Sequence, residues 1–213
     1  MLFVTKKEEI YMTDNQLILS KLTNPKKLWS RQEILQRPSP IPAENGIYAW
    51  YFKEIPNLKL FREYFNIDSS CLIEDTIKFE DYQLLYIGIS PSNPQSKNNI
   101  RNRIRSHMNS NASASTLRLT LGCLLREELN IQLKQIRNRY YFGEEENILS
   151  SWIERNAFVT FEPCHEPWII EEEAIKQLNL PLNILDNEHN NFYNALKNIR
   201  KQAKNLARKN PYS

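Results

Sequence analysis

The sequence has no apolar run long enough to cross a membrane. Its 213 residues are 41% hydrophobic and 25% charged, which is typical of a soluble globular domain. The longest apolar runs fall far short of the roughly 20 residues that span a bilayer. The first residues, MLFVTKKEEIYM, also lack the long apolar stretch of a secretory signal. We therefore expect a cytoplasmic protein with no membrane partner.

Cysteine is scarce, and the cysteines are odd in number and widely spaced: Cys71, Cys123 and Cys164. This pattern favours reduced thiols over a disulfide framework. Cys164 lies beside His165, but two adjacent ligands without a second pair are a weak signal for zinc. A chain of this length can bury a core without disulfides or a structural metal, so we expect the core to hold the fold.

Acidic residues are absent from His189 to Ser213, although the net charge of the whole chain is only +3. Residues 190–208 have the apolar spacing of a helix. Basic residues follow three- and four-residue steps along it, at Lys197, Arg200, Lys201, Lys204 and Arg208. Because phosphate contacts supply much of the affinity for DNA, these residues are candidate contacts to a DNA backbone. A solubilising face is the alternative.

No internal repeat or low-complexity segment occurs, so hydrophobic periodicity predicts the elements. Residues 47–52 and 83–89 are predicted to form an antiparallel strand pair, and residues 157–164 a third strand. We predict a mixed α/β (α+β) domain in which a small three-stranded sheet is flanked by helices. Helices are predicted in pieces over 14–37, with Asp14 as the candidate cap of the first piece. Further helices are predicted near 58–66, from residue 100, and at 116–129, 147–156, 167–180 and 190–208.

Glycine is also rare, with four in the chain, so Gly46 and Gly88 are informative. Gly46 begins the apolar run GIYAWYF, and Gly88 lies in LLYIGIS. Turn chemistry before a strand explains Gly46 on its own. The recurrence of tyrosine beside glycine raises a second interpretation, in which Tyr48 and Tyr86 meet a substrate. Glycines would let backbone and substrate approach each other near these tyrosines.

Several motifs occur together and in order. GIY is found at 46–48, YIG at 86–88, RIRSH at 103–107 and a run of glutamates at 171–173 in a helix that ends in PLN. This set resembles the GIY-YIG nuclease superfamily, and RIRSH looks like the helix of its type II restriction enzymes. In two departures from the family, the two tyrosines lie further apart and the asparagine of PLN lies one residue closer to its proline.

The resemblance implies the GIY-YIG fold and divides the chain into three parts. Residues 1–45 would be a helical extension, 46–187 the nuclease domain and 188–213 a basic C-terminal helix. The long segment 53–82 would be an insert between the first two strands, with a short helix of its own.

The resemblance also implies roles for particular side chains. Tyr48 would be a general base, and Tyr86 would orient water or phosphate. Arg103 presents a fixed fork of donors that matches phosphate oxygens. His107 follows four residues later, on the same helical face, and could take a proton from a tyrosine or from water. Otherwise Arg103 is an exposed charge, His107 a surface or capping residue, and the tyrosines anchor the sheet.

A carboxylate and an amide complete the predicted site. Glu171 would bind Mg²⁺ or Mn²⁺, because such hard cations prefer oxygen ligands. Counting back from Pro181 instead selects Glu172, and a solvated helix start is the alternative for these glutamates. Asn183 would hold the active-site loop or a phosphate, or would simply end a helix. The spaced Asp/Glu cluster of a two-metal nuclease is lacking, so we predict one metal.

The sequence therefore predicts a Mg²⁺-dependent endonuclease that hydrolyses DNA phosphodiesters. A stand-alone nuclease of restriction or defence is preferred over repair. No recognisable zinc finger or helix-turn-helix is present, which weighs against a mobile-element endonuclease. An inactive nucleic-acid-binding module of the same fold is the main alternative, and a protein-interaction domain is another. Residues 112–129 are more apolar than a surface helix needs, which indicates core or a homodimer contact.

Overall fold

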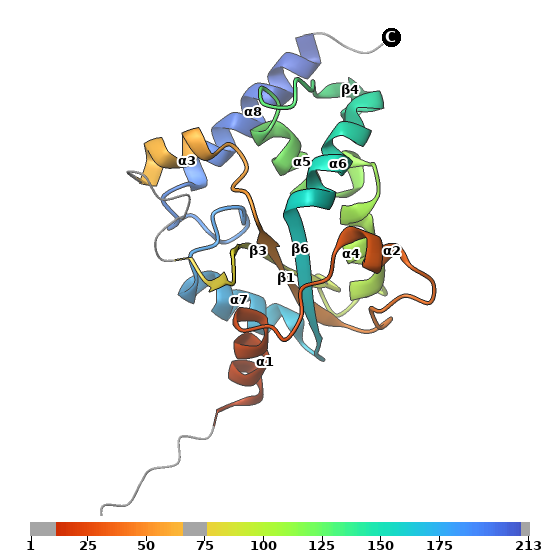
Figure 1. Cartoon of the computed structure of the whole chain (residues 1–213), viewed down its shortest axis with the longest axis vertical. Helices are drawn as coiled ribbons and strands as arrows, with labels where there is room; N and C mark the ends of the chain where they lie inside the picture. The colour runs from red at the N-terminus through yellow and green to blue at the C-terminus, as the bar shows by residue number, and fades with distance from the viewer. Residues whose placement is uncertain (1–11, 66–75, 210–213) are drawn as a thin grey trace, which may run out of the picture.

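A four-stranded antiparallel sheet organises the computed structural model, which describes residues 12–65 and 76–209 (Figure 1). Its order is β2-β3-β1-β6. The prediction of three strands was therefore wrong. The two residues of β2 are too few to show an alternating pattern, so no periodic signal predicted this strand. The strands are β1 (Gly46–Phe52), β2 (Lys78–Phe79), β3 (Tyr82–Ser90) and β6 (Ala157–Pro163).

Helices surround this sheet, and the described part of the predicted insert forms α3 and β2. A small hairpin, β4 (Lys134–Ile136) with β5 (Arg139–Tyr141), was not predicted. Short 3-10 turns occupy Ala112–Ala114 and Gly143–Glu145. Cys71 lies outside the described residues. The helices are α1 (Asp14–Thr23), α2 (Arg31–Leu35), α3 (Leu58–Phe65), α4 (Ile100–Met108), α5 (Thr116–Leu124), α6 (Glu146–Asn156), α7 (Pro167–Gln177) and α8 (Tyr193–Lys209).

Two helix ends differ from the sequence expectation. The N-cap of α1 is Thr13 rather than Asp14: the Thr13 hydroxyl accepts from the Gln16 backbone N–H, and the Gln16 side chain accepts from the Thr13 N–H. This reciprocal capping satisfies two donors that a helix start otherwise leaves free. Helix α5 ends at Leu124, short of residue 129, and charged residues follow at Arg126, Glu127 and Glu128.

Strand β1 is buried along its whole length and separates two core clusters. Successive side chains of a strand point to opposite faces. Tyr48 and Trp50 accordingly belong to the cluster that contains residues of α4, α5 and α6. Ile47 and Ala49 belong to the cluster with residues of α1 and α7. In Figure 1, α1 and α7 lie together on one side of the sheet, while α2, α4 and α6 lie on another.

The register of the sheet places the two glycines where a side chain would not fit. Tyr48 pairs with Gly88 across β1 and β3. A Cβ added at Gly88 would lie 2.6 Å from the Tyr48 hydroxyl oxygen, and one added at Gly46 would lie 2.5 Å from the Glu162 carbonyl oxygen. Both approaches are too close for a side chain, so glycine at these positions follows from packing.

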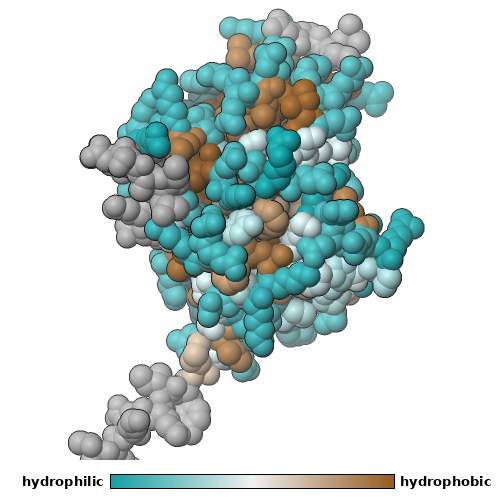
Figure 2. Space-filling model, in the orientation of Figure 1, coloured by the Kyte–Doolittle hydropathy of each residue, from teal (hydrophilic) through white to brown (hydrophobic). Residues whose placement is uncertain are grey.

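The face shown in Figure 2 is mostly hydrophilic, and its hydrophobic residues form small areas with hydrophilic side chains around them. Within residues 12–65 and 76–209, no helix combines the length and the apolar character that a membrane crossing would require.

A buried ion pair ties α5 to α6. The Arg118 side chain is fully buried, and its Nε donates to Glu146 Oε2 at 2.7 Å. The Arg118 Nη2 donates to the Ser150 hydroxyl at 2.8 Å, while Glu146 Oε1 accepts from the Ala112 backbone N–H at 2.8 Å. This network fixes the turn that leads into α5.

We expect Arg118→Met to lower the free energy of unfolding by about 3–5 kcal/mol, because it leaves the buried Glu146 carboxylate without its partner. Urea unfolding followed by circular dichroism measures this loss. The control is Lys176→Met, which removes the exposed Lys176–Glu172 pair and should cost no more than about 1 kcal/mol. Equal losses in the two variants would contradict the assignment of Arg118 as a structural anchor.

Candidate active site

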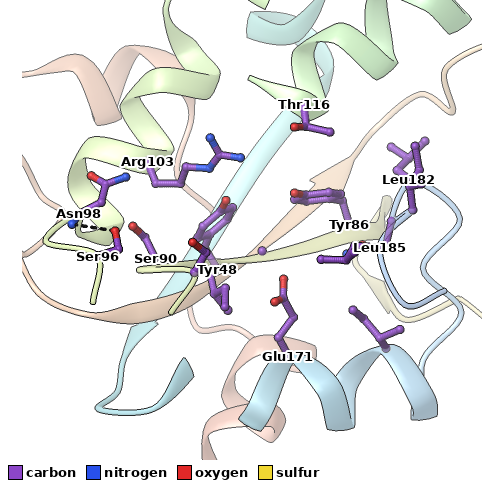
Figure 3. A pocket seen from close by; sticks show the side chains of 16 residues that line it. Tyr48, Tyr86, Ser90, Ser96, Asn98, Arg103, Thr116, Glu171, Leu182 and Leu185 are labelled. Atoms are coloured by element: carbon purple, nitrogen blue, oxygen red, sulfur yellow. Dashed lines mark hydrogen bonds between the residues drawn. The ribbon is translucent and has the colours of Figure 1, made fainter. Parts of the chain in front are cut away.

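A cavity of about 350 Å³ gathers side chains from four elements. Tyr48 comes from β1, Tyr86 from β3, Arg103 from α4 and Glu171 from α7 (Figure 3). Figure 3 shows Glu171 extending from α7 toward the two tyrosine rings. Asn183, from the loop after α7, also lines the cavity. The structure therefore brings together residues that are spread over most of the chain.

His107 lies behind Tyr48 rather than in the cavity wall. Its Nε2 is 2.8 Å from the Tyr48 hydroxyl oxygen, and its Nδ1 is 2.6 Å from the Ser115 hydroxyl oxygen. All three side chains are buried. Ser115 was not predicted from the sequence. Its serine-rich context indicated only a helix start, and Ser115 is indeed the N-cap of α5, where its hydroxyl accepts from the Arg118 backbone N–H.

Burial keeps this tyrosine–histidine pair neutral. It raises the pKa of Tyr48 well above the usual value, and Tyr86 raises this pKa further while the charge of Arg103 opposes the rise. Burial also lowers the pKa of His107 well below its usual value, and Arg103 contributes to that fall. Near pH 7 the pair is thus a neutral hydrogen-bonded unit, and Tyr48 is not a preformed phenolate.

Tyr86 is held neutral in a similar way. Burial raises the pKa of its hydroxyl to about 12, and the charge of Glu171 adds to the rise. The positive charges of Arg103 and Arg200 act in the opposite direction. Tyr86 can therefore offer a hydroxyl hydrogen bond at any ordinary working pH.

Arg103 is the cation at the centre of the cavity. Burial lowers its pKa, but Tyr48 and Tyr86 raise it by more, so the net pKa lies above the usual value and the guanidinium stays charged. Its Nη1 donates to the Ala114 carbonyl at 3.3 Å. Neither Arg101 nor Arg105 lines the cavity, and Arg101 donates instead to the Ile41 carbonyl. Two-residue steps on a helix point to different faces, which separates these three arginines.

Glu171 and Glu172 occupy different environments. Glu171 lines the cavity, and burial raises the pKa of its carboxyl to about 7, with Asp186 adding to the rise and Arg103 opposing it. Glu172 is exposed and pairs with Lys176 at 2.6 Å. Helix α7 has no acidic residue in its first turn, so the helix dipole does not account for Glu171.

Asn183 fastens the loop after α7 to strand β3. Its Oδ1 accepts from the Ile87 backbone N–H at 2.9 Å, and its Nδ2 donates to the Ile87 carbonyl at 2.8 Å. Ile87 lies between Tyr86 and Gly88, so the buried amide holds β3 beside the cavity. The oxygen and the nitrogen of the side-chain amide are both engaged in this contact. Holding the loop was one of the roles considered for Asn183 from the sequence.

The donors in the cavity suit a hard divalent cation. They are oxygen atoms of the Glu171 carboxylate and of the tyrosine hydroxyls, and cations such as Mg²⁺ prefer oxygen ligands while keeping several waters. Among the described residues no group of three or more His, Cys, Asp or Glu side chains is arranged to hold a metal. A cation in this cavity would thus have Glu171 as its protein carboxylate.

Helix α8 lines a second hollow, of about 570 Å³, which we call the α8 groove. Ile184 lines both the α8 groove and the cavity around Tyr48 and Glu171, so the two hollows adjoin. Lys197, Lys201 and Arg208 are exposed, whereas Arg200 is half-buried and its charge acts on Tyr86. The walls of the groove are basic and amide side chains apart from Ile184: Asn194, Lys197, Asn198, Arg200, Lys201, Lys204, Asn205 and Arg208.

The raised pKa of Glu171 predicts how stability depends on pH. A carboxyl with a folded pKa of about 7 and an ordinary pKa of 4.5 binds more protons when folded, so stability falls as pH rises through that window. Glu171→Gln should remove this fall and make the protein more stable than wild type at pH 8, by about 1–3 kcal/mol.

Urea unfolding in chelator at pH 4.5 and pH 8 tests this expectation. Glu172→Gln is the matched control, since the pKa of Glu172 is lowered by its pair with Lys176 and its loss should leave the fall in place. If Glu171→Gln shows the same fall as wild type, Glu171 does not carry it.

Comparison with known proteins agrees with the geometry of the cavity. The family model described as the GIY-YIG catalytic domain matches residues 46–202. Comparisons with curated proteins and with solved structures gave no significant match. The match covers more than half of the chain and includes both tyrosines, Arg103 and Glu171. The chain therefore belongs to the GIY-YIG nuclease superfamily and is an endonuclease, a phosphodiester hydrolase.

Proposed function

We propose that the protein cleaves DNA with one divalent cation, in the cavity formed by Tyr48, Tyr86, Arg103 and Glu171. The observation that supports this most directly is the convergence of these four side chains, from four separate elements, on one cavity. Phosphodiester hydrolysis requires an activated water and stabilisation of the charge that develops on the phosphoryl and leaving oxygens, and a charged guanidinium, two neutral hydroxyls and a carboxylate can meet these needs.

Arg103 binds the scissile phosphate. Its guanidinium remains charged and donates to the non-bridging oxygens, where negative charge increases during attack by water. Glu171 would hold Mg²⁺ or Mn²⁺, whose Lewis acidity stabilises charge on the phosphoryl and leaving oxygens. The Tyr86 hydroxyl donates a hydrogen bond to the attacking water or to the phosphate and thereby orients it.

Tyr48 and His107 provide a path for the proton of the attacking water, and Ser115 holds the His107 ring in place. With a proton on Nδ1, His107 donates to the Ser115 hydroxyl, and its Nε2 accepts from Tyr48. As the water oxygen attacks phosphorus, Tyr48 accepts the water proton and passes its own proton to His107 Nε2. Burial and Arg103 disfavour the imidazolium that forms, the negative charge of the bound phosphate stabilises it, and it returns its proton through Tyr48 to solvent when the product leaves. The P–O bond to the leaving oxygen breaks, and that oxygen takes a proton from solvent. This relay needs no preformed phenolate, in agreement with the raised pKa of Tyr48.

The α8 groove binds the DNA backbone beside the cavity. It adjoins the cavity at Ile184, and its basic and amide side chains match the donors that contact phosphates. Arg200 is set deeper than the other basic residues of α8, and its charge reaches Tyr86, so it contacts the phosphate nearest the cleavage site. Lys197, Lys201, Lys204 and Arg208 contact phosphates further along.

In biological role we favour a restriction or defence nuclease, because RIRSH in α4 resembles the helix of type II restriction enzymes. Repair of DNA uses the same chemistry. Cleavage of both strands at one place would require two copies of the site acting together, which makes a homodimer the natural assembly for restriction.

Cleavage of supercoiled plasmid and of mixed-sequence duplexes, with Mg²⁺ or with chelator, tests the nuclease. Wild type should cut only with the cation. Glu171→Ala and Arg103→Ala should each lower the rate by about 100-fold or more, as loss of a group that stabilises transition-state charge does. The control Glu154→Gln, at an exposed residue of α6 that lines none of the described hollows, should cut like wild type. An absence of cutting in wild type, with DNA binding unchanged in the variants, would instead favour an inactive binding module.

Salt dependence of DNA binding tests the α8 groove. Each phosphate contact contributes about 0.9 to the slope of log K against log salt. The variants Lys201→Gln and Arg208→Gln should each lower this slope by roughly 1 and weaken binding to all sequences alike. Lys26, exposed and outside the groove, supplies the control Lys26→Gln. Slopes that match wild type in both groove variants would make α8 a solubilising face.

A further inference from the structure

A third hollow, of about 490 Å³, adjoins the catalytic cavity; we call it the Trp168 pocket. It shares no residue with the α8 groove. The catalytic cavity thus borders a basic groove at one place and the Trp168 pocket at another. The residues common to the catalytic cavity and the Trp168 pocket are Ile89, Ser92, Glu171, Ile175 and Leu185.

The walls of the Trp168 pocket offer a surface for a flat apolar ligand. Trp168 is half-buried, and among the described residues its ring makes no aromatic pair and belongs to neither core cluster. Leu185, at the rim, is 74% exposed. Ile175, a residue of the core, and Ile89, which packs against the core, complete the apolar lining.

The charges of the Trp168 pocket repel phosphate. Glu171, Glu172 and Asp186 line it, against one cation, Lys176, which is paired with Glu172 at 2.6 Å. Asp186 has no ion-pair partner within the part of the chain that the structure describes. Carboxylates accept hydrogen bonds from the exocyclic amino groups of bases, as they do from cytosine. The chemistry of the walls therefore fits a nucleobase and opposes the sugar-phosphate backbone.

We propose that the Trp168 pocket binds one unstacked nucleobase of the nucleotide next to the scissile phosphate. This inference rests on the proposed DNA cleavage at Glu171. Because the two hollows share five lining residues, a nucleotide whose phosphate is held at Arg103 can extend from the catalytic cavity into the pocket. A hollow of 490 Å³ is within the range of small-ligand sites, roughly 300–1,000 Å³.

The proposal defines the class of substrate. Flipping a base out of the stack of a matched duplex costs a few kcal/mol of unstacking and unpairing free energy, and this cost is least for a mismatched or single-stranded base. The nuclease should therefore prefer DNA in which the base beside the cleavage site is unpaired. Stacking on Trp168 then stabilises that base by the same kind of contact that single-strand-binding proteins use.

The experiment compares cleavage of a matched duplex with cleavage of the same duplex carrying one mismatch at successive positions. Wild type should cut the mismatched duplex faster when the mismatch adjoins the cleavage site. Trp168→Ala should lower kcat/KM on that substrate by roughly 5- to 100-fold, the range expected for loss of one base–aromatic stack. Trp168→Phe, which keeps a ring, should lose less. An abasic nucleotide at the same position should abolish the difference between wild type and Trp168→Ala.

Ile169→Ala is the matched control, because Ile169 is an exposed neighbour of Trp168 on α7 and does not line the pocket. Circular dichroism confirms that each variant is folded. The proposal is overturned if folded Trp168→Ala cuts every substrate at the wild-type rate, or if its loss is equal on matched, mismatched and abasic DNA.

A second readout separates this proposal from the proposed function. Single-stranded DNA with 2-aminopurine at successive positions is bound in chelator, where no cleavage is expected. Stacking on Trp168 should quench the 2-aminopurine fluorescence in wild type but not in Trp168→Ala. Trp168-dependent quenching with no cleavage in Mg²⁺ would contradict the proposed cleavage mechanism and support base binding in the Trp168 pocket. Cleavage without Trp168-dependent quenching would support the cleavage mechanism and contradict base binding in the pocket.

Discussion

The pairing of Tyr48 with Gly88 across strands β1 and β3 is the constraint on which the site depends. The Tyr48 ring occupies the space that a side chain at position 88 would take. This packing places the Tyr48 hydroxyl next to His107, and the same register leaves Tyr86 two residues away along β3. Helix α4 then needs only a four-residue spacing to present both Arg103 and His107 to the two tyrosines.

Burial and charge act against each other in this cavity. Burial is the largest influence on the pKa of Tyr48, Tyr86, His107 and Glu171, and in each case it favours the neutral form. Arg103 stays charged because the tyrosines around it outweigh its own burial. The result is one fixed cation beside two neutral hydroxyls and a carboxyl whose pKa is about 7, which is a preorganised arrangement for an incoming phosphate. Burying these groups disfavours folding, and the surrounding structure offsets this. Part of that structure is the Arg118–Glu146 pair, which holds the start of α5.

The surroundings of the cavity are chemically unequal. The α8 groove is basic, while the Trp168 pocket is apolar with a net negative charge. A polynucleotide has two kinds of surface, charged phosphates and flat bases, and each of these hollows complements one of them. Basic residues line the hollow beyond Ile184, where we propose backbone contact, and acidic residues line the hollow beside Glu171, where we propose base binding.

The sequence by itself determined the family, the three main strands and most helices, because ordered motifs and periodic apolar residues are local signals. It did not reveal β2 or the β4–β5 hairpin, whose strands are too short for a pattern. Only the tertiary structure shows that Glu171 lines the cavity and Glu172 does not, since this depends on which face of α7 meets the cavity. Ser115 and Trp168 likewise gained their candidate roles from neighbours distant in sequence: a serine that caps a helix and a tryptophan on an amphipathic helix look ordinary until the fold places them beside His107 and Glu171.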